Sequence, residues 1–209
     1  MVDGDGKTWT GTESNPTGDS ADAYYNSGKG WIPIDTYIAI FDGNGYTIDN
    51  LFIKREAGDS GEAGLFKGIG LGRVVRNLGL KDILVRTHGN AGGIASDNHG
   101  TIQTSFVTGS TYGTTSGLIT ARNYGVIRDS YNKGTVGAVG TGAVVGGIAG
   151  NRSTTGGTIK NSWTATAVTQ TGGVQGGISG SGTGTITNSY FDKTVYGTTS
   201  TKHLSLIHI

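Results

Sequence analysis

The sequence predicts an all-β protein in which short parallel strands stack as a β-solenoid of about six coils. Three observations predict this fold: a phrase that returns about every 27 residues, 40 glycines against 2 prolines in 209 residues, and apolar runs that are short and β-branched. Self-similarity at such a period is typical of arrays in which each repeat packs on its neighbours. The length therefore counts coils and not domains.

The repeated phrase has two halves, a Gly-Gly-Ile segment and a Gly-Thr-Ile-x-Asn-Ser-aromatic segment. It is clearest at 146–163 and 176–190, and looser copies lie at 64–78, 92–106 and 116–131. The apolar residue of the second half marks the period, in steps of 27, 27, 25, 32 and 27, at Ile48, Val75, Ile102, Ile127, Ile159 and Ile186.

A coil of about 27 residues suits three short strands joined by bends, because a strand residue advances about 3.3 Å and neighbouring coils lie about 4.8 Å apart. The aliphatic residues of both halves are then expected to form stacked layers of the core. The predicted core consists of Ile48, Leu65, Val75, Ile94, Ile102, Leu118, Ile127, Ile148, Ile159, Ile178 and Ile186.

Two columns flank this core. Strand periodicity puts Ile102, Thr104 and Phe106 on one side, so the aromatic column of Phe106, Tyr131, Trp163 and Tyr190 is expected to be buried. A further buried column is expected at Val136, Val168 and Val195.

The polar residues between the apolar ones are expected to lie in bends, where Asn and Asp side chains satisfy backbone groups. These bend residues are Asn50, Asn77, Asn161 and Asn188. The glycines of the Gly-Gly-Ile segments allow tight curvature or a positive φ. These structural glycines are Gly93, Gly117, Gly147, Gly150, Gly177 and Gly180.

The chain divides into three parts. Residues 1–30 are polar and form at most a partial cap, residues 31–200 form the solenoid, and residues 201–209 ignore the repeat. The last of these parts resembles a translated sequencing adapter, so we exclude it from reasoning about the fold. Uncapped solenoid ends present unpaired backbone groups, so we expect association through them.

The composition narrows the class of protein. A formal net charge of +1 without a basic cluster disfavours nucleic acid as a partner. No run of 18 apolar residues indicates a membrane span, and the absence of cysteine excludes disulfides and thiolate metal sites. The chain starts without a secretory signal, and we interpret it as a piece of a longer exported protein.

No catalytic constellation stands out, and we expect neither a cofactor nor a metal. Twelve of 15 acids lie at or before Asp82, while Asp97, Asp129 and Asp192 occupy different columns. The histidines lack the His-Glu-x-x-His spacing of zinc peptidases. The acids of the first third are best explained by surface turns, and they are Asp35, Asp42, Asp49, Glu56, Asp59, Glu62 and Asp82.

The repeats resemble the GLUG motif family, named for a Gly-Leu-x-Gly core. Segments 147–150 and 177–180 match that core with Ile for Leu, whereas 64–67, 93–96 and 117–120 depart at the last position. The resemblance covers about residues 31–195. It implies a right-handed parallel β-helix in a large exported or cell-surface bacterial protein, often adhesin-like and sometimes beside an immunoglobulin-cleaving metallopeptidase.

The expected function is therefore a non-catalytic adhesive or stalk module, extracellular or at the cell surface, whose partner is a host-surface or extracellular glycan or protein. One alternative is a carbohydrate-binding or carbohydrate-active β-helix whose catalytic part lies outside this segment. Another is a spacer beside a peptidase placed elsewhere in the chain.

Overall fold

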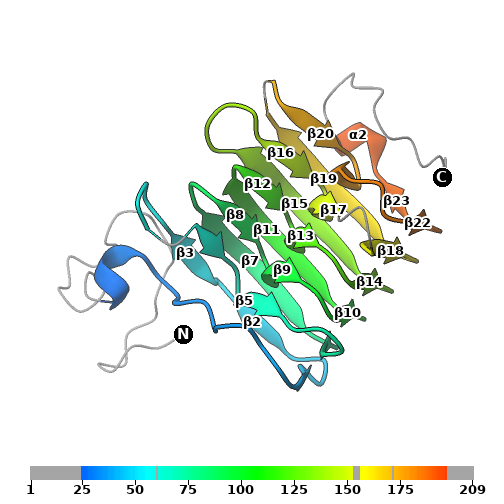
Figure 1. The fold of residues 1–209 in the computed structure, drawn as a ribbon, viewed down its shortest axis with the longest axis horizontal. Coiled ribbons are helices and arrows are strands. Elements are labelled where there is room, and N and C mark those ends of the chain that lie inside the picture. Colours follow the sequence, from blue (N-terminus) through cyan, green and yellow to red (C-terminus); the bar gives the residue numbers. More distant parts are fainter. Residues whose placement is uncertain (1–24, 60, 153–155, 171, 197–209) are drawn as a thin grey trace.

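The computed structural model describes residues 25–59, 61–152, 156–170 and 172–196. Its chain winds into a parallel β-solenoid of about five turns, in which equivalent strands of successive turns lie side by side (Figure 1). Helix is confined, in this part of the chain, to a 3-10 turn η1 (Tyr25–Gly28) and a four-residue α2 (Lys193–Tyr196). The prediction of an all-β parallel solenoid is confirmed.

Four parallel sheets run along the solenoid. Sheet 1 contains, in spatial order, β1 (Ile40–Asp42), β6 (Val74–Arg76), β10 (Thr101–Gln103), β14 (Val126–Arg128), β18 (Thr158–Lys160) and β22 (Ile186–Thr187). Sheet 2 contains β2 (Thr47–Asp49), β7 (Gly79–Arg86), β11 (Phe106–Gly113), β15 (Tyr131–Ala138), β19 (Trp163–Thr169) and β23 (Tyr190–Phe191), and β3 (Phe52–Lys54) also pairs with β7.

Sheets 3 and 4 are two narrow faces joined by the Gly-Gly-Ile segment. Sheet 3 contains β4 (Glu62–Ala63), β8 (Asn90–Gly92), β12 (Thr115–Gly117), β16 (Val144–Gly146) and β20 (Val174–Gly176). Sheet 4 contains β5 (Phe66–Ile69), β9 (Ala95–Asn98), β13 (Thr120–Asn123), β17 (Ala149–Arg152) and β21 (Ser179–Ser181). A coil thus has four strands and not the three expected, because this segment bends one face into two.

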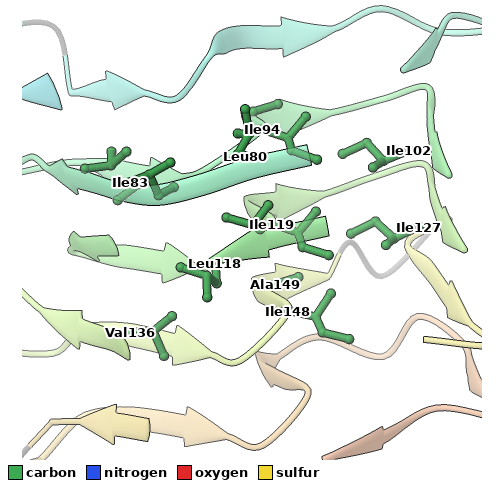
Figure 2. Close-up of a cluster of buried hydrophobic side chains, with 14 of the residues drawn as sticks. Leu80, Ile83, Ile94, Ile102, Leu118, Ile119, Ile127, Val136, Ile148 and Ala149 are labelled. Atoms are coloured by element: carbon green, nitrogen blue, oxygen red, sulfur yellow. The ribbon is translucent and has the colours of Figure 1, made fainter. Parts of the chain in front are cut away.

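The core consists of aliphatic columns that run down the axis. Figure 2 shows Ile102 beside Ile127 of the next coil, and Ile94, Ile119 and Ile148 as a second column. The first column also holds Val75 and Ile159, and the second Leu65 and Ile178, all of them buried. Ile186, in the last coil, is only partly buried.

Ile48, a predicted core residue, lies in a different register from the one expected. Phe41, and not Ile48, pairs with Val75, whereas Ile48 pairs with Leu80 in sheet 2 and is half-buried. The first coil is therefore longer than its successors.

A one-residue shift affects the third copy of the Gly-Gly-Ile segment. Gly117 pairs with Gly92 and Gly146, so Leu118 occupies the place of the second glycine, and Ile119 that of Ile94. Leu118 is fully buried all the same. The Gly-Leu dipeptide at 117–118 is thus not equivalent to Gly93-Ile94.

The paired glycines are required by close approach and not by a positive φ. A Cβ on Gly147 would lie 2.2 Å from the Gly177 carbonyl oxygen, and one on Gly93 would lie 2.7 Å from Ile83 Cδ1 and 2.9 Å from Val107 Cγ1. Gly117, Gly150, Gly177 and Gly180 are similarly crowded by backbone or ring atoms. None of the six predicted structural glycines has a positive φ.

The positive φ falls instead on the polar bend column. Asn77, Asp129, Asn161 and Asn188 have φ between 44° and 52°, and Thr104 has 49°. Asn and Asp tolerate this left-handed conformation better than other residues with a Cβ. Asn161 Nδ2 donates to Asp129 Oδ1 at 3.0 Å, so successive bends are also linked along the surface. These bends turn the chain from sheet 1 into sheet 2.

Asn50 does not belong to this column. Its φ of 58° and the 2.8 Å bond from its N–H to the Lys81 carbonyl place it opposite Asp82, whose φ is 53°. It therefore lies in an irregularity within sheet 2 and not at the corner between the sheets.

A serine ladder, which the sequence reasoning missed, follows each bend. Each hydroxyl donates to the carbonyl two residues earlier at 2.7–2.8 Å, and accepts the N–H of the residue one coil back at 3.2–3.3 Å. The ladder consists of Ser105, Ser130, Ser162 and Ser189, all buried. It satisfies backbone groups where the corner interrupts the regular pairing. The serine that precedes the aromatic residue in each of these copies was its signal in the sequence.

Aromatic residues close the core at both ends of the described solenoid. At the first coil, Tyr37 and Phe41 pack on Phe66 at centroid distances of 4.9 and 5.5 Å. At the last coil, the Phe191 and Tyr196 rings meet at 5.5 Å, and Tyr196 is buried. Val195, predicted to extend the column of Val136 and Val168, lies instead in α2 and is exposed.

Most of the N-terminal segment and the whole of the tail lie outside the described residues. This holds for residues 1–24 of the polar segment 1–30 and for residues 201–209. Whether the ends associate therefore stays a prediction.

We expect Ile159→Ala to lower the free energy of unfolding by about 2–5 kcal/mol, because the side chain is fully buried between Ile127 and Ile186. Denaturant unfolding would measure this. A loss below about 0.5 kcal/mol, the range of surface substitutions, would contradict the stacked core.

The bend conformation is tested by a matched pair of variants at Asn161. Both Asn161→Gly and Asn161→Ala remove the hydrogen bond to Asp129, but only alanine is strained at a φ of 49°. We expect the alanine variant to be less stable than the glycine variant by about 1 kcal/mol. Equal stability of the two variants would show that the left-handed conformation is not maintained.

Candidate binding surface

The most prominent surface feature is a ladder of aromatic rings on the outer face of sheet 2. Phe106, Tyr131 and Trp163 occupy equivalent positions at the starts of β11, β15 and β19, which lie side by side in Figure 1. The Phe106 and Tyr131 rings stack at 5.2 Å and 8°, and the Tyr131 and Trp163 rings at 5.1 Å and 5°. We call these three residues the aromatic ladder.

The prediction that this column is buried is wrong. Tyr131 and Trp163 are 38% and 45% exposed, and Phe106 and Tyr190 are half-buried. The error comes from the bend: strand alternation does not continue through a left-handed residue, so the serine, and not the bend residue, points inward. The aromatic residue that follows each serine then points to solvent.

The rings of the ladder cover each other only in part. Near-parallel rings at these centroid distances fall in the range of offset stacks, in which a ring face extends past its neighbour. At the Phe106 end of the ladder, the outer ring face is covered by the backbone of Gly79, because a Cβ on Gly79 would lie 2.6 Å from the Phe106 ring. The exposed part of the ladder is therefore the part formed by Tyr131 and Trp163.

Small and hydroxylated residues form the floor beside the ladder. The next outward position along the strands holds Thr108, Lys133 and Ala165, and the one after it holds Ser110, Thr135 and Ala167. Except for Lys133, which is exposed, these residues are half-buried. The outward positions that follow the aromatic ladder thus form a strip of mostly small or hydroxylated residues.

Basic residues border the exposed end of the ladder. Lys133 lies two residues after Tyr131, and Lys160 lies three residues before Trp163, across the Asn161 bend. Neither ammonium group is within ion-pair distance of a carboxylate of the described residues.

The carboxylates are dispersed and mostly paired. Arg122 donates from Nε to Asp97 Oδ1 at 2.6 Å, and this hydrogen bond raises the pKa of Arg122. Asp129 pairs with Arg128 at 3.2 Å, and Asp192 accepts hydrogen bonds from the Thr194 hydroxyl and N–H, which lower its pKa. The three later acids therefore lie apart, as expected from their columns.

Among the acids of the first third, Glu62 meets Asp97 at the Arg122 guanidinium, at 3.5 and 2.5 Å from the same nitrogen, and Arg122 neutralises both. Asp35, Asp42, Asp49, Glu56, Asp59 and Glu62 each pair with a basic residue, and Asp82 accepts from the Thr108 hydroxyl. Of these carboxyl groups, Asp42 and Asp59 have a lowered pKa, chiefly through the hydrogen bonds from Asn77 and from Lys29, respectively. Across the described part of the chain, no three His, Cys, Asp or Glu side chains are placed to hold a metal ion together.

Two buried polar groups serve the interior of the solenoid. Asn132 Nδ2 donates to the Gly147 carbonyl at 2.9 Å and to the Thr164 and Thr166 hydroxyls at 2.8 and 2.7 Å. Arg152 is buried and donates to the Gly182 and Gly184 carbonyls, and its burial lowers its pKa. Both groups are buried and tie neighbouring coils together, which gives them a structural role.

Comparison with known proteins gives one partial match. Over 114 aligned residues the chain is 35% identical to halomucin of Haloquadratum walsbyi. The aligned segment covers 51% of this chain and 1% of halomucin. The chain thus spans about 1% of the length of the curated relative it matches. No family model and no solved structure matches the chain.

The structure also bears on a membrane location. None of the helices in the described residues is long and apolar enough to cross a bilayer.

We expect Trp163→Ala to cost about 0.5–1.5 kcal/mol, the value of an aromatic stack, because the ring packs on Tyr131 outside the core. A buried tryptophan would cost about 3–5 kcal/mol instead. Denaturant unfolding distinguishes the two costs, and a loss of about 3–5 kcal/mol would show that the aromatic column is buried in the core.

Proposed function

We propose that this chain is a non-catalytic solenoid module of an exported or cell-surface protein, which acts as a stiff stalk or adhesive surface. The observation that carries the proposal is the continuous stack of coils. Each coil pairs in register with the next through four sheets, so bending would break hydrogen bonds on several sides at once.

The polar chemistry of the described surface supports a structural role. Most of its carboxylates are engaged in ion pairs, several of them between coils, such as Arg76 with Asp42 and Lys81 with Asp49. Glycoside hydrolases, by contrast, use two carboxyl groups about 5–10 Å apart and directed at one bond. The two acids that do meet, Glu62 and Asp97, are both bound by Arg122, which favours a module that binds or spaces over one that cleaves.

The sequence comparisons are consistent with this proposal. The partial relative carries the name halomucin, and the match covers about 1% of it, which fits a module within a very long chain. The resemblance of 147–150 and 177–180 to the GLUG core supports a location at the surface of a bacterial cell, on the strength of the motifs alone. The whole parent protein is, in this proposal, a large exported chain in which this module is one part.

A second candidate function is carbohydrate binding, and the exposed aromatic ladder favours it. Tyr and Trp side chains provide large rigid contact areas with a polar edge. Their exposure removes the main argument for treating this column as a packing device only.

The proposal is tested in cells and with the isolated module. Antibodies against the solenoid should label intact source cells, and the purified chain should not depolymerise common polysaccharides with or without calcium. Labelling only after permeabilisation would contradict the surface location. Turnover that is lost in Asp97→Asn or Asp129→Asn would contradict the non-catalytic role.

A further inference from the structure

We infer that the exposed end of the aromatic ladder, with Lys133 and Lys160 beside it, binds an acidic polysaccharide. This inference deepens the proposed adhesive function and rests on it. It names the partner class by the chemistry of the surface, namely sugar rings that bear carboxylate groups.

The first support is the shape of the strip. Tyr131 and Trp163 present partly exposed, stacked rings on the outer face of sheet 2, and the outward positions beside them hold Lys133, Thr135, Ala165 and Ala167. A sugar ring has an apolar face of C–H groups and a rim of hydroxyls. The apolar face of such a ring can pack against the exposed rings of the aromatic ladder, while its hydroxyls reach the Thr135 hydroxyl.

The second support is charge. Described residues 83–196 contain seven basic and three acidic side chains, a net charge of +4, whereas residues 25–82 contain seven of each. The ladder thus lies in the positive half of the solenoid. An acidic polymer is attracted to this half, and the attraction weakens as salt is added.

The third support is that the two lysines next to the rings are not neutralised by carboxylates of the described residues. Arg122 and Arg128 are paired with Asp97 and Asp129. Lys133 and Lys160, in contrast, have no such ion pair in the described part of the chain. Lys133 follows the ladder on sheet 2, and Lys160 ends β18 of sheet 1 just before the Asn161 bend, so the sequence order places one cation on each side of the rings.

The ladder geometry also sets the direction of the ligand. The rings succeed one another from coil to coil and not along a strand. A polysaccharide that contacts both Tyr131 and Trp163 therefore runs across the strands, parallel to the solenoid axis. The binding surface would then grow with the number of coils, as repeat arrays use extended faces for binding.

Affinity electrophoresis of the full 209-residue chain in gels containing alginate tests the inference, with neutral dextran as the control polymer. We expect retardation by alginate only, and we expect it to decline with added salt. Trp163→Ala should weaken the binding by about tenfold or more, as loss of a stacking ring does in base recognition. Trp163→Phe, which keeps a ring, should largely retain it.

Matched variants separate the site from general effects. Tyr124→Ala breaks another stacked pair, with His99 at 4.4 Å, on a different edge of the coil and should leave binding unchanged. Lys133→Gln with Lys160→Gln should weaken binding and reduce its salt dependence. Lys54→Gln with Arg73→Gln removes two charges elsewhere and should have little effect. Circular dichroism of each variant checks that the fold persists.

Three results would overturn the inference: no retardation by alginate, retardation that Trp163→Ala leaves unchanged, or equal loss in the Tyr124→Ala and Lys54→Gln/Arg73→Gln controls. Self-association that depends on Trp163, without retardation by alginate, would assign the ladder to contacts between copies of the chain and would also overturn it. None of these results would disprove the stalk role, which is tested by cell labelling and turnover.

Discussion

The structure depends on one constraint, which is that every coil must present its backbone groups in register to the coil before and after it. The corner between sheets 1 and 2 shows how the repeat meets this constraint. A left-handed residue such as Asn161 turns the chain, and the Ser162 hydroxyl then bonds both to its own coil and to the N–H of Ser130 in the neighbouring coil. The corner repeats identically, so the strands on both of its sides stay aligned.

Packing inside the coils follows from this alignment. Columns of equivalent residues stack at a fixed spacing, so a bulky residue requires small ones around it. Gly93 leaves the room that Ile83 and Val107 occupy, while the equivalent position in the next coil holds Leu118. The array thus tolerates substitution within a column as long as the total volume is balanced across the core.

The same corner decides which side chains the surface displays. Since the serine turns inward, the aromatic residue after it turns outward, and three successive coils build the aromatic ladder. The inter-coil ion pairs and the closed aromatic ends suit a durable stalk. In the proposed function, the ladder and the two lysines near it would supply the surface through which such a stalk adheres.

The sequence by itself determined the repeat, the strand class and most of the core, because periodic apolar residues such as Ile102, Ile127 and Ile159 can be buried in only one way when coils stack. It also located the bends at Asn77, Asn161 and Asn188, since Asn has a local preference for left-handed backbone, but it wrongly counted Asn50 among them. It did not determine which way a side chain points after such a bend, and Trp163 was assigned to the wrong side for that reason. It also misplaced Ile48 and Leu118, because the residues around them resemble the repeat. Pairing between coils, and not this local resemblance, sets their register. Only the tertiary structure decided these points, since backbone pairing between coils acts over about 25 to 35 residues of sequence separation and no local pattern encodes it fully.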